Sequence, residues 1–534
     1  MQPTDHRGGR SPGQSARSPL TPAFSVFRTR NLLDVSAIIM SLSSPYQNLR
    51  ARFREAALLG STNGVLGWDQ ETGLPVKAIG WRAEQMSYLT GLEHRLTTAP
   101  EVGDWLAACE AGAFPMDSTE AANLRGWRRD FDRETKLPGA LVEALSLTTS
   151  EGMHTWAAAR QASDFAAFQP VLEKLVRLCQ EKADYLGWTT CRYDALMNIY
   201  EPGAKSAEIG ALFSGLGPEV AALIGPAMEK AKACPEDLLK GSYPLAAQQA
   251  FNREVAEAVG FDFEAGRIDT TTHPFCTGLG PGDTRLTTRY DEADFFSSLS
   301  GVMHEAGHGL YDQGLRAEEW GMPAGSAVSL GIHESQSRLW ENHIGGSEVF
   351  WQHWYPRACH YFPDLKHFTP EQVAAAARRV APSFIRVDAD EVTYDQHIIL
   401  RFELERSLIN GDLAVKDVPE AWNSRFKELL GLTVPDDARG CLQDIHWSMG
   451  SLGYFCTYTL GNLNASQLMR TARLAMPSLD ADLAQGSYGN LLSWLRTNLH
   501  THGRTFDPQD LMRRVTGETT QAGYHLGYLK GKFL

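Results

Sequence analysis

The 534-residue sequence predicts a mainly α-helical protein with a small β-hairpin. From Tyr46 onward, apolar residues recur at helical spacing in long segments rich in Ala, Leu, Glu, Lys and Arg, such as residues 168–186, 207–231 and 244–260. Short Pro or Gly breaks separate these segments. The chain exceeds the roughly 250 to 300 residues at which a single core stops growing, so we expect two helical lobes with a cleft between them.

The first 40 residues differ in composition from the rest of the chain. Residues 1–30 carry five arginines and one acid among many Ser, Pro, Gly and Thr residues, a composition that does not form a core. A transit peptide would have this composition. We favour a disordered or non-native extension over residues 1–40, because the sequence after Met40 is typical of a helix start. Residues 41–534 then form a single catalytic unit.

Composition excludes several classes of function. The formal net charge is −14, which would repel a nucleic-acid backbone. We find no apolar run of about 18 residues that would span a membrane. Eight cysteines are scattered without a Cys-x-x-Cys pair. This pattern indicates reduced thiols in the cytoplasm and argues against a zinc site built from thiolates.

Residues 267–290 interrupt the helical pattern. Two Thr-rich runs flank a Gly/Pro turn there, which predicts a small β-hairpin. An exposed edge strand next to a catalytic site could pair with the backbone of a peptide. The alternative is a surface hairpin that binds nothing.

A metal-binding motif follows directly. Residues 294–310 have a helix start at Asp294 and apolar residues at helical spacing, and they contain His304-Glu305-Ala-Gly-His308. Histidines four residues apart on a helix share a face, so both rings can bind one zinc ion, and Glu305 lies beside them as a general base. The alternative is two partly buried histidines in an ordinary helix.

A catalytic zinc usually has a third protein ligand. Glu334 is the best candidate, in a polar cluster of an otherwise helical segment. His333 is the rival, because neighbouring residues on a helix do not both face one ion. Asp312, two turns after His304, could hold a ligand histidine in place or could simply lie on the helix surface.

Six ordered motifs of this chain resemble those of the carboxypeptidase Taq family of zinc metallocarboxypeptidases. These motifs are His273-Pro-Phe, Asp283-Thr-Arg285-Leu-Thr, His304-Glu305-Ala-Gly-His308, His333-Glu334-Ser-Gln336, Ile385-Arg386-Val-Asp-Ala-Asp390 and Gly440-Cys-Leu-Gln-Asp444-Ile-His446-Trp447. The resemblance covers about residues 45–534. It implies an elongated helical fold with a deep central groove, usually a homodimer, that removes single C-terminal residues from peptides with broad specificity.

The resemblance also implies roles for individual residues. By motif match the zinc ligands are His304, His308 and Glu334, with Glu305 as the general base. Cobalt could substitute for zinc in such a site. The family resemblance predicts one ion per chain.

Further residues resemble those that contact the substrate. Arg386 and Tyr458, with Tyr454 as the weaker candidate, would meet the C-terminal carboxylate and the developing oxyanion. His446 is placed with the substrate-binding residues, as are His273, Asp283 and Arg285. Cys456 stands where the family resemblance leads us to expect proline.

Some of these residues have a purely structural alternative. Arg386 could pair with Asp388 or Asp390 in a salt bridge. His446 could be a core histidine.

Two rival functions remain open from the sequence. A zinc endopeptidase or oligopeptidase would use the same metal chemistry in a groove that is open at both ends. A non-catalytic helical scaffold with a structural zinc is less consistent with the motif, because structural sites are usually Cys-rich and Glu305 is present.

Overall fold

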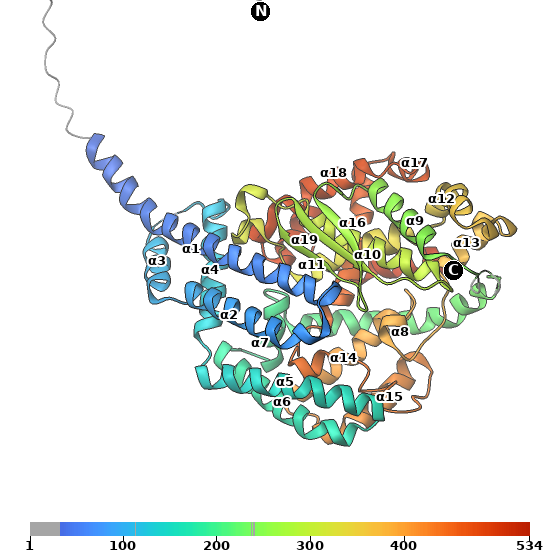
Figure 1. The fold of residues 1–534 in the computed structure, drawn as a ribbon, viewed down its shortest axis with the longest axis horizontal. Coiled ribbons are helices and arrows are strands. Elements are labelled where there is room, and N and C mark those ends of the chain that lie inside the picture. Colours follow the sequence, from blue (N-terminus) through green and yellow to red (C-terminus); the bar gives the residue numbers. More distant parts are fainter. Residues whose placement is uncertain (1–31, 113, 236–237, 239–240) are drawn as a thin grey trace, which may run out of the picture.

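The computed structural model describes residues 32–534 apart from residues 113, 236, 237, 239 and 240, and residues 32–44 only as helix. The predicted extension over residues 1–40 therefore lies mostly outside the described residues and stays a prediction. Within the described part, the mainly α-helical fold is confirmed (Figure 1). The assignment of residues 41–534 to one catalytic unit of two lobes also stays a prediction.

Helices precede and follow one small sheet. The helices before it are α1 (Leu32–Thr72), α2 (Ile79–Thr97), α3 (Pro100–Glu110), α4 (Thr119–Thr135), α5 (Gly139–Ala162), α6 (Phe165–Leu186), α7 (Arg192–Tyr200), α8 (Ser206–Ala231) and α9 (Leu245–Ala258). Those after it are α10 (Phe295–Asp312), α11 (Leu330–Arg338), α12 (Glu348–Tyr361), α13 (Pro370–Ala377), α14 (Tyr394–Asn410), α15 (Val418–Leu430), α16 (Cys456–Ala475), α17 (Leu479–Ala484), α18 (Gly489–Asn498), α19 (Pro508–Thr516) and α20 (Ala522–Phe533). A π-helical segment, Leu339–Gly345, continues α11.

The helix start indicated after Met40 is wrong. Helix α1 begins at Leu32, because the residues between Leu32 and Met40 include no Pro or Gly that would end a helix, and Pro45 lies inside it. The three long segments singled out by periodicity are confirmed as α6, α8 and α9.

The sheet is larger than the predicted hairpin. Strands β2 (Cys276–Gly280) and β3 (Asp283–Thr288) form an antiparallel hairpin, and β1 (Gly266–Thr270) pairs with β3 in parallel. The hairpin turn includes Gly282 at a φ of 83°, which favours glycine. The first Thr-rich run is therefore a third strand rather than an arm of the hairpin. Strand β2 lies at an edge of this sheet, beside α1.

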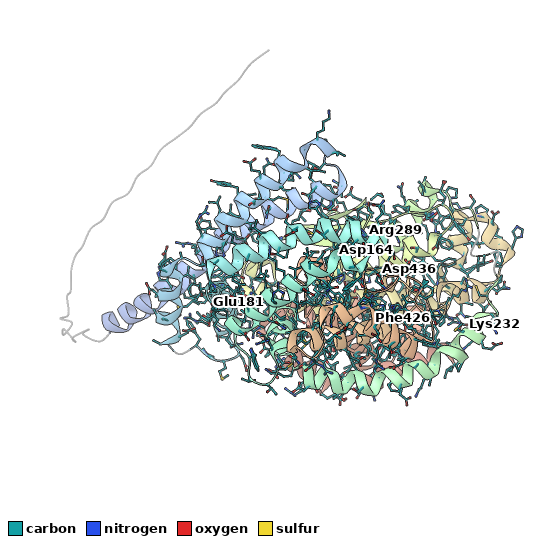
Figure 2. All side chains as sticks on the ribbon, turned by 90° about the horizontal axis from the view of Figure 1, so that it is seen from below. Asp164, Glu181, Lys232, Arg289, Phe426 and Asp436 are labelled. Carbon is teal, nitrogen blue, oxygen red and sulfur yellow. The ribbon has the colours of Figure 1, made fainter. Side chains whose placement is uncertain are left out.

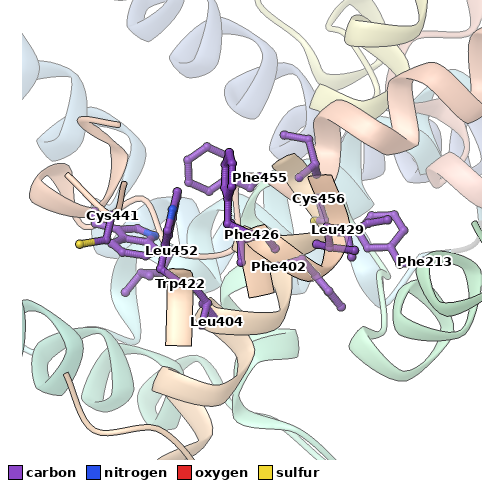
Figure 3. Packing of buried hydrophobic residues seen from close by; sticks show 14 of the residues in the cluster. Phe213, Phe402, Leu404, Trp422, Phe426, Leu429, Cys441, Leu452, Phe455 and Cys456 are labelled. Atoms are coloured by element: carbon purple, nitrogen blue, oxygen red, sulfur yellow. The ribbon is translucent and has the colours of Figure 1, made fainter. Parts of the chain in front are cut away.

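The core on the side of α8, α14 and α15 is closely packed and aromatic (Figure 3). Phe213 of α8 meets Phe402 of α14 edge to face with ring centroids 5.1 Å apart. Trp422 of α15 is 1% exposed and packs at right angles to Trp447. A second apolar core surrounds α10, α12 and α16.

Helix α8 is long and apolar enough to cross a membrane by length and composition alone. Its buried residues, among them Phe213, Val220 and Leu223, instead join the core with α14 and α20. The helix runs toward Lys232 at its exposed C-terminal end (Figure 2). Its apolar face is thus largely accounted for by packing within the protein.

Helix α11 lies between α10 and α16 in close backbone contact with both. A methyl group on Gly307 of α10 would lie 2.6 Å from the carbonyl oxygen of Gln336 and 2.6 Å from the Cα of Ser337. A methyl group on Gly461 of α16 would overlap the side chain of Glu334. These two glycines allow α11 to sit deep between its neighbours, and this depth sets the position of Glu334.

We expect Gly307→Ala to destabilise the protein, because the new methyl group must push α10 and α11 apart. An overpacked core contact of this kind costs about 1–3 kcal/mol. Urea unfolding measures this change. Gly215→Ala is the matched control: Gly215 lies within α8 with open space around its Cα, so alanine should be neutral or stabilise by roughly 0.4–1 kcal/mol. Equal midpoints for the two variants would contradict the close contact.

Candidate active site

Helix α10 presents the His-Glu-x-x-His motif toward α11. The helix begins at the predicted residue: the Asp294 carboxylate accepts a hydrogen bond from the backbone N–H of Ser297 at 3.1 Å. The predicted apolar face of α10 is buried. The rings of His304 and His308 therefore lie on the other side of the helix, with centroids 4.9 Å apart.

The structure brings His304, His308 and Glu334 together around one point. The Glu334 Oε2 atom lies 3.8 Å from His304 Nε2 and 3.5 Å from His308 Nε2. One ligand atom from each residue lies within 4.8 Å of the other two. Two imidazoles and a carboxylate that converge in this way fit a divalent metal ion with one position left for water or substrate.

Glu305 is buried next to this cluster. Glu305 follows His304 directly in α10 and is 6% exposed. Burial raises the pKa of Glu305 to about 7, and neighbouring His304 opposes this shift. A carboxylate with a pKa near neutrality is suited to accept a proton and to return it.

His304 is held by a carboxylate on the side away from the cluster. Its Nδ1 atom lies 2.8 Å from Glu341 Oε2, in the π-helical segment. The other Glu341 oxygen accepts a hydrogen bond from Ser300 at 2.6 Å. This contact fixes the ring so that Nε2 faces Glu334.

Arg338 joins the two carboxylates. Its Nε donates to Glu334 Oε1 at 2.8 Å and its Nη1 donates to Glu341 Oε2 at 3.3 Å. The guanidinium also lies over the ring of Tyr394, 4.2 Å from the centroid. Arg338 therefore orients Glu334 while leaving Glu334 Oε2 directed at the histidines.

His308 is held by a second histidine. His333 Nδ1 lies 2.5 Å from His308 Nδ1, and His333 Nε2 lies 3.1 Å from Asp312 Oδ1. Because both ring nitrogens of His333 are engaged, it is not placed as the third ligand. Asp312 does not touch His308 directly but supports it through His333.

The charges of the site favour a cation. Burial acts to lower the pKa of His304, but Glu334 and Glu341 outweigh it and raise that pKa to about 9. Burial and nearby His333 lower the pKa of His308 to about 4. Burial opposes ionisation of Glu334, yet Arg338 and His304 hold its pKa well below the usual range. The ionised carboxylates thus attract positive charge to the point that the donor atoms share.

Arg386 lies in a cluster that is joined to the metal-binding residues through Tyr394. Its Nη1 donates to the Tyr394 hydroxyl at 2.9 Å, and its Nε donates to Asp444 at 3.0 Å. Asp444 also accepts from Arg401 Nε at 2.7 Å. The ion-pair partner of Arg386 is therefore Asp444 rather than Asp388 or Asp390, although Arg386 remains placed near the site.

Two tyrosines and a histidine complete this cluster. Tyr458 lies at the start of α16, and its ring centroid is 4.9 Å from Cζ of Arg386. The ring centroids of Tyr454 and Tyr458 are 5.4 Å apart. Burial raises the pKa of both tyrosines, so both keep the hydroxyl proton and can donate it in a hydrogen bond. The His446 ring is tilted against the Tyr454 ring with centroids 5.2 Å apart, and burial lowers the pKa of His446 to about 4.

His273, Asp283 and Arg285 lie on the sheet side. His273 is exposed in the loop between β1 and β2. Asp283 and Arg285 form a two-point ion pair on β3 at 2.8 Å, and Arg285 also lies over Trp68 of α1. No contact of these three residues with the metal-binding residues is found among the described residues.

Sequence reasoning missed Arg338, Glu341 and Tyr394. Glu334, Arg338 and Glu341 follow the spacing i, i+4, i+7, which places three charged residues on one helix face. This spacing from Glu334 could have indicated Arg338 and Glu341. Tyr394 carries no such signal, because it reaches the site from α14.

A cavity of about 790 Å³ has Asp312 among its lining residues, and we call it the Asp312 cavity. Strand β2 and helix α1 form two of its walls, and Arg316 and Arg496 also line it. A side chain on Gly278 of β2 would lie 2.7 Å from Asp312 Oδ2. The edge strand thus passes directly beside the residue that supports His308.

Comparisons with known proteins agree along almost the whole chain. The family model for carboxypeptidase Taq (M32) metallopeptidases matches residues 48–533. Thermostable carboxypeptidase 1 of Thermus thermophilus is 41% identical over 505 residues, which cover 92% of this chain and 99% of the relative. Thermostable carboxypeptidase 1 of Pyrococcus furiosus is 35% identical, with 91% and 98% covered.

Solved structures agree with this result. The M32 carboxypeptidase of Deinococcus radiodurans superposes with a TM-score of 0.89 at 39% identity, covering 92% of this chain and 99% of that one. Metallocarboxypeptidase 1 of Trypanosoma cruzi gives 0.87 at 35% identity with the same coverage. This similarity supports neither the endopeptidase nor the scaffold reading of the sequence. The chain belongs to the carboxypeptidase Taq (M32) family and is a metallocarboxypeptidase.

Proposed function

We propose that the protein uses one zinc ion to release single C-terminal residues from peptides with broad specificity. The observation that carries this proposal is the convergence of His304, His308 and Glu334 beside the buried Glu305. Two histidines and one carboxylate are a donor set of catalytic zinc sites. Cobalt, which accepts similar ligands, would substitute for zinc.

The residues of the chain have distinct roles in this reaction. A zinc ion held by His304, His308 and Glu334 would activate water and polarise the scissile carbonyl. Glu305 takes the proton of the attacking water and passes it to the leaving amine. Tyr458, supported by Tyr454, donates a hydrogen bond to the oxyanion that develops on the carbonyl oxygen.

Arg386 is proposed to bind the free C-terminal carboxylate. Asp444 and Tyr394 engage its Nε and Nη1 atoms, and no partner of Nη2 is found among the described residues. A guanidinium pre-oriented in this way can meet a carboxylate oxygen with a defined geometry. His446 lies beside this position and would contact the same end of the substrate.

The Asp312 cavity is proposed to hold the peptide chain. Its wall includes the edge strand β2, which suits an extended peptide backbone. His273, Asp283 and Arg285 belong to the loop and strand beside β2, so they would act on the peptide rather than on the metal.

We also propose a cytoplasmic homodimer that binds neither nucleic acid nor membrane. All eight cysteines are free, which is consistent with a reducing compartment, and the negative net charge disfavours nucleic acid. Light scattering of the purified protein measures the oligomeric state.

Glu305→Gln and Glu334→Ala should separate catalysis from metal binding. Glu305→Gln removes the base but no ligand, so zinc content should stay near one per chain while turnover falls by about 10²- to 10⁴-fold. Glu334→Ala should lose both zinc and activity, because two histidines hold zinc weakly. Elemental analysis and peptide hydrolysis measure both quantities. Full zinc occupancy in Glu334→Ala would place the third ligand elsewhere.

Asp312→Ala should weaken zinc binding, because His333 would lose the acceptor that orients it toward His308. Loss of such an outer contact typically costs about 10- to 100-fold in metal affinity. Competition with a chelator measures the zinc affinity. Asp312→Asn keeps an acceptor oxygen and is the control that should bind zinc nearly as well as wild type. Equal zinc affinity in the alanine variant and the wild type would rule out this support.

Amidation of the C-terminus of a substrate should lower the cleavage rate by roughly 100-fold, because Arg386 would lose the substrate carboxylate that it is proposed to bind. Arg386→Ala should slow cleavage of the free acid and reduce this acid-to-amide ratio. Mass spectrometry of the products from matched peptides measures both rates. An unchanged ratio in Arg386→Ala would assign carboxylate binding to another cation.

A further inference from the structure

The C-terminal helix α20 contacts the π-helical segment that carries Glu341. Three residues of α20, His525, Tyr528 and Lys532, follow the spacing i, i+3, i+7 and so share one face of the helix. This face meets residues 342 and 343, directly after Glu341 in the chain. Helix α20 therefore contacts the chain next to the residue that orients the metal ligand His304.

The π-helical turn leaves the backbone carbonyl of Asn342 open to side-chain donors. In a regular α-helix, the backbone N–H of Gly346 would donate to the carbonyl of Asn342. Here it donates to the carbonyl of Glu341 at 2.8 Å instead. A methyl group on Gly346 would lie 3.0 Å from the Asn342 oxygen and 2.8 Å from Lys532 Nζ, so glycine keeps the approach to this oxygen open.

Helix α20 supplies two donors to this carbonyl. Lys532 Nζ donates to the Asn342 oxygen at 2.8 Å, and the Tyr528 hydroxyl donates to it at 3.1 Å. Lys532 also donates to Glu391 Oε2 at 2.6 Å and to the Tyr528 hydroxyl at 2.9 Å, so its three N–H groups are all used. Burial lowers the pKa of Lys532, and Glu391 opposes this shift. A buried ammonium with every donor engaged holds its acceptors in defined positions.

His343 is held by the same face of α20. The Tyr528 ring stacks on the His343 ring, with centroids 3.7 Å apart. Ser466 of α16 lies between the two histidines, with its Oγ atom 3.1 Å from His343 Nε2 and 2.8 Å from His525 Nδ1. His525 Nε2 lies 2.9 Å from Asp395 of α14, which fixes α20 in turn. Two successive residues of the π-helical segment are thus fixed from one helix.

We propose that Lys532 and Tyr528 are positioning residues for the metal site. By holding the Asn342 carbonyl, they stabilise the π-helical turn that directs Glu341 at Nδ1 of His304. Glu341 then keeps Nε2 of His304 facing the metal position. The inference rests on the proposed role of His304 as a zinc ligand, and neither Lys532 nor Tyr528 touches the metal-binding atoms or the proposed substrate sites.

The zinc affinity of full-length variants, measured by competition with a chelator, tests this proposal. Lys532→Met alone would leave the Glu391 carboxylate unpaired, so it is made together with Glu391→Gln and compared with Glu391→Gln. Loss of a direct outer contact typically costs about 10- to 100-fold in metal affinity. Lys532 acts one residue further out, so we expect zinc affinity to fall by roughly three- to tenfold.

Tyr528→Phe gives a second test that retains the ring and its stack on His343. It removes only the hydroxyl, so zinc affinity should fall in the same direction even if the Lys532 variant does not fold. Tyr524→Phe is the matched control, because Tyr524 lies on the same helix and its hydroxyl donates to Glu518 instead. This control should bind zinc as wild type does.

A double-mutant cycle separates positioning through Glu341 from general destabilisation. Glu341→Ala removes the contact with His304, so adding Tyr528→Phe to it should not lower zinc affinity further. The visible spectrum of the cobalt-loaded protein, which reports the ligand geometry, should change in Tyr528→Phe and stay unchanged in Tyr524→Phe. An equal loss of zinc affinity with and without Glu341 would overturn the positioning role.

The wild-type protein distinguishes this inference from the proposed function. Zinc binding by the wild type, with the same affinity and cobalt spectrum in the Lys532 and Tyr528 variants, overturns the positioning role alone. A wild-type protein that binds no zinc overturns both the positioning role and the proposed zinc site.

Discussion

The active site depends on the close placement of two buried carboxylates and one partly buried carboxylate next to two imidazoles. Glu305 follows His304 in the chain, and Glu334 and Glu341 lie beside the metal-binding histidines in space, where burial makes negative charge costly. Arg338 offsets part of this charge through Glu334 and Glu341. The remaining attraction for a cation raises the pKa of His304, and a divalent ion bound by the same atoms satisfies it more fully. Metal affinity and base strength therefore share one electrostatic origin.

The helix packing that makes this arrangement rigid follows from small residues. Gly307 of α10 and Gly461 of α16 let α11 approach both helices closely enough for Glu334 to reach the histidines of α10. A side chain at Gly461 would clash with Glu334 itself, and one at Gly307 would clash with the backbone of α11 just after Glu334. Helix α11, which supplies Glu334, has only nine residues. A helix this short is stabilised mainly by packing against its neighbours, so α10 and α16 set its position.

Much of the metal site was predictable, because its signals are local. A helix start at Asp294, apolar residues at helical spacing and histidines four apart determine which residues share a face of α10. Glu334 was a candidate from its polar cluster, with His333 as the rival, and its motif favoured it; the structure adds the close packing that brings it to the histidines. The pairing of Arg386 with Asp444 joins residues 58 positions apart, so no periodicity could indicate it. For the same reason β1 was read as one arm of a hairpin, although it pairs with β3 in parallel.

The two ligand histidines are supported by different polar residues. His308 is held through His333 by Asp312, which lines the cavity proposed to hold the peptide. His304 is held by Glu341, which lines a second cavity of about 230 Å³. Each support ends at a cavity rather than in the apolar core, so the hydrogen bonds that orient the metal ligands lie next to space that a ligand can enter. Toward the core, α10 and α11 instead pack closely through Gly307, so no polar contact is needed there to hold the two helices together.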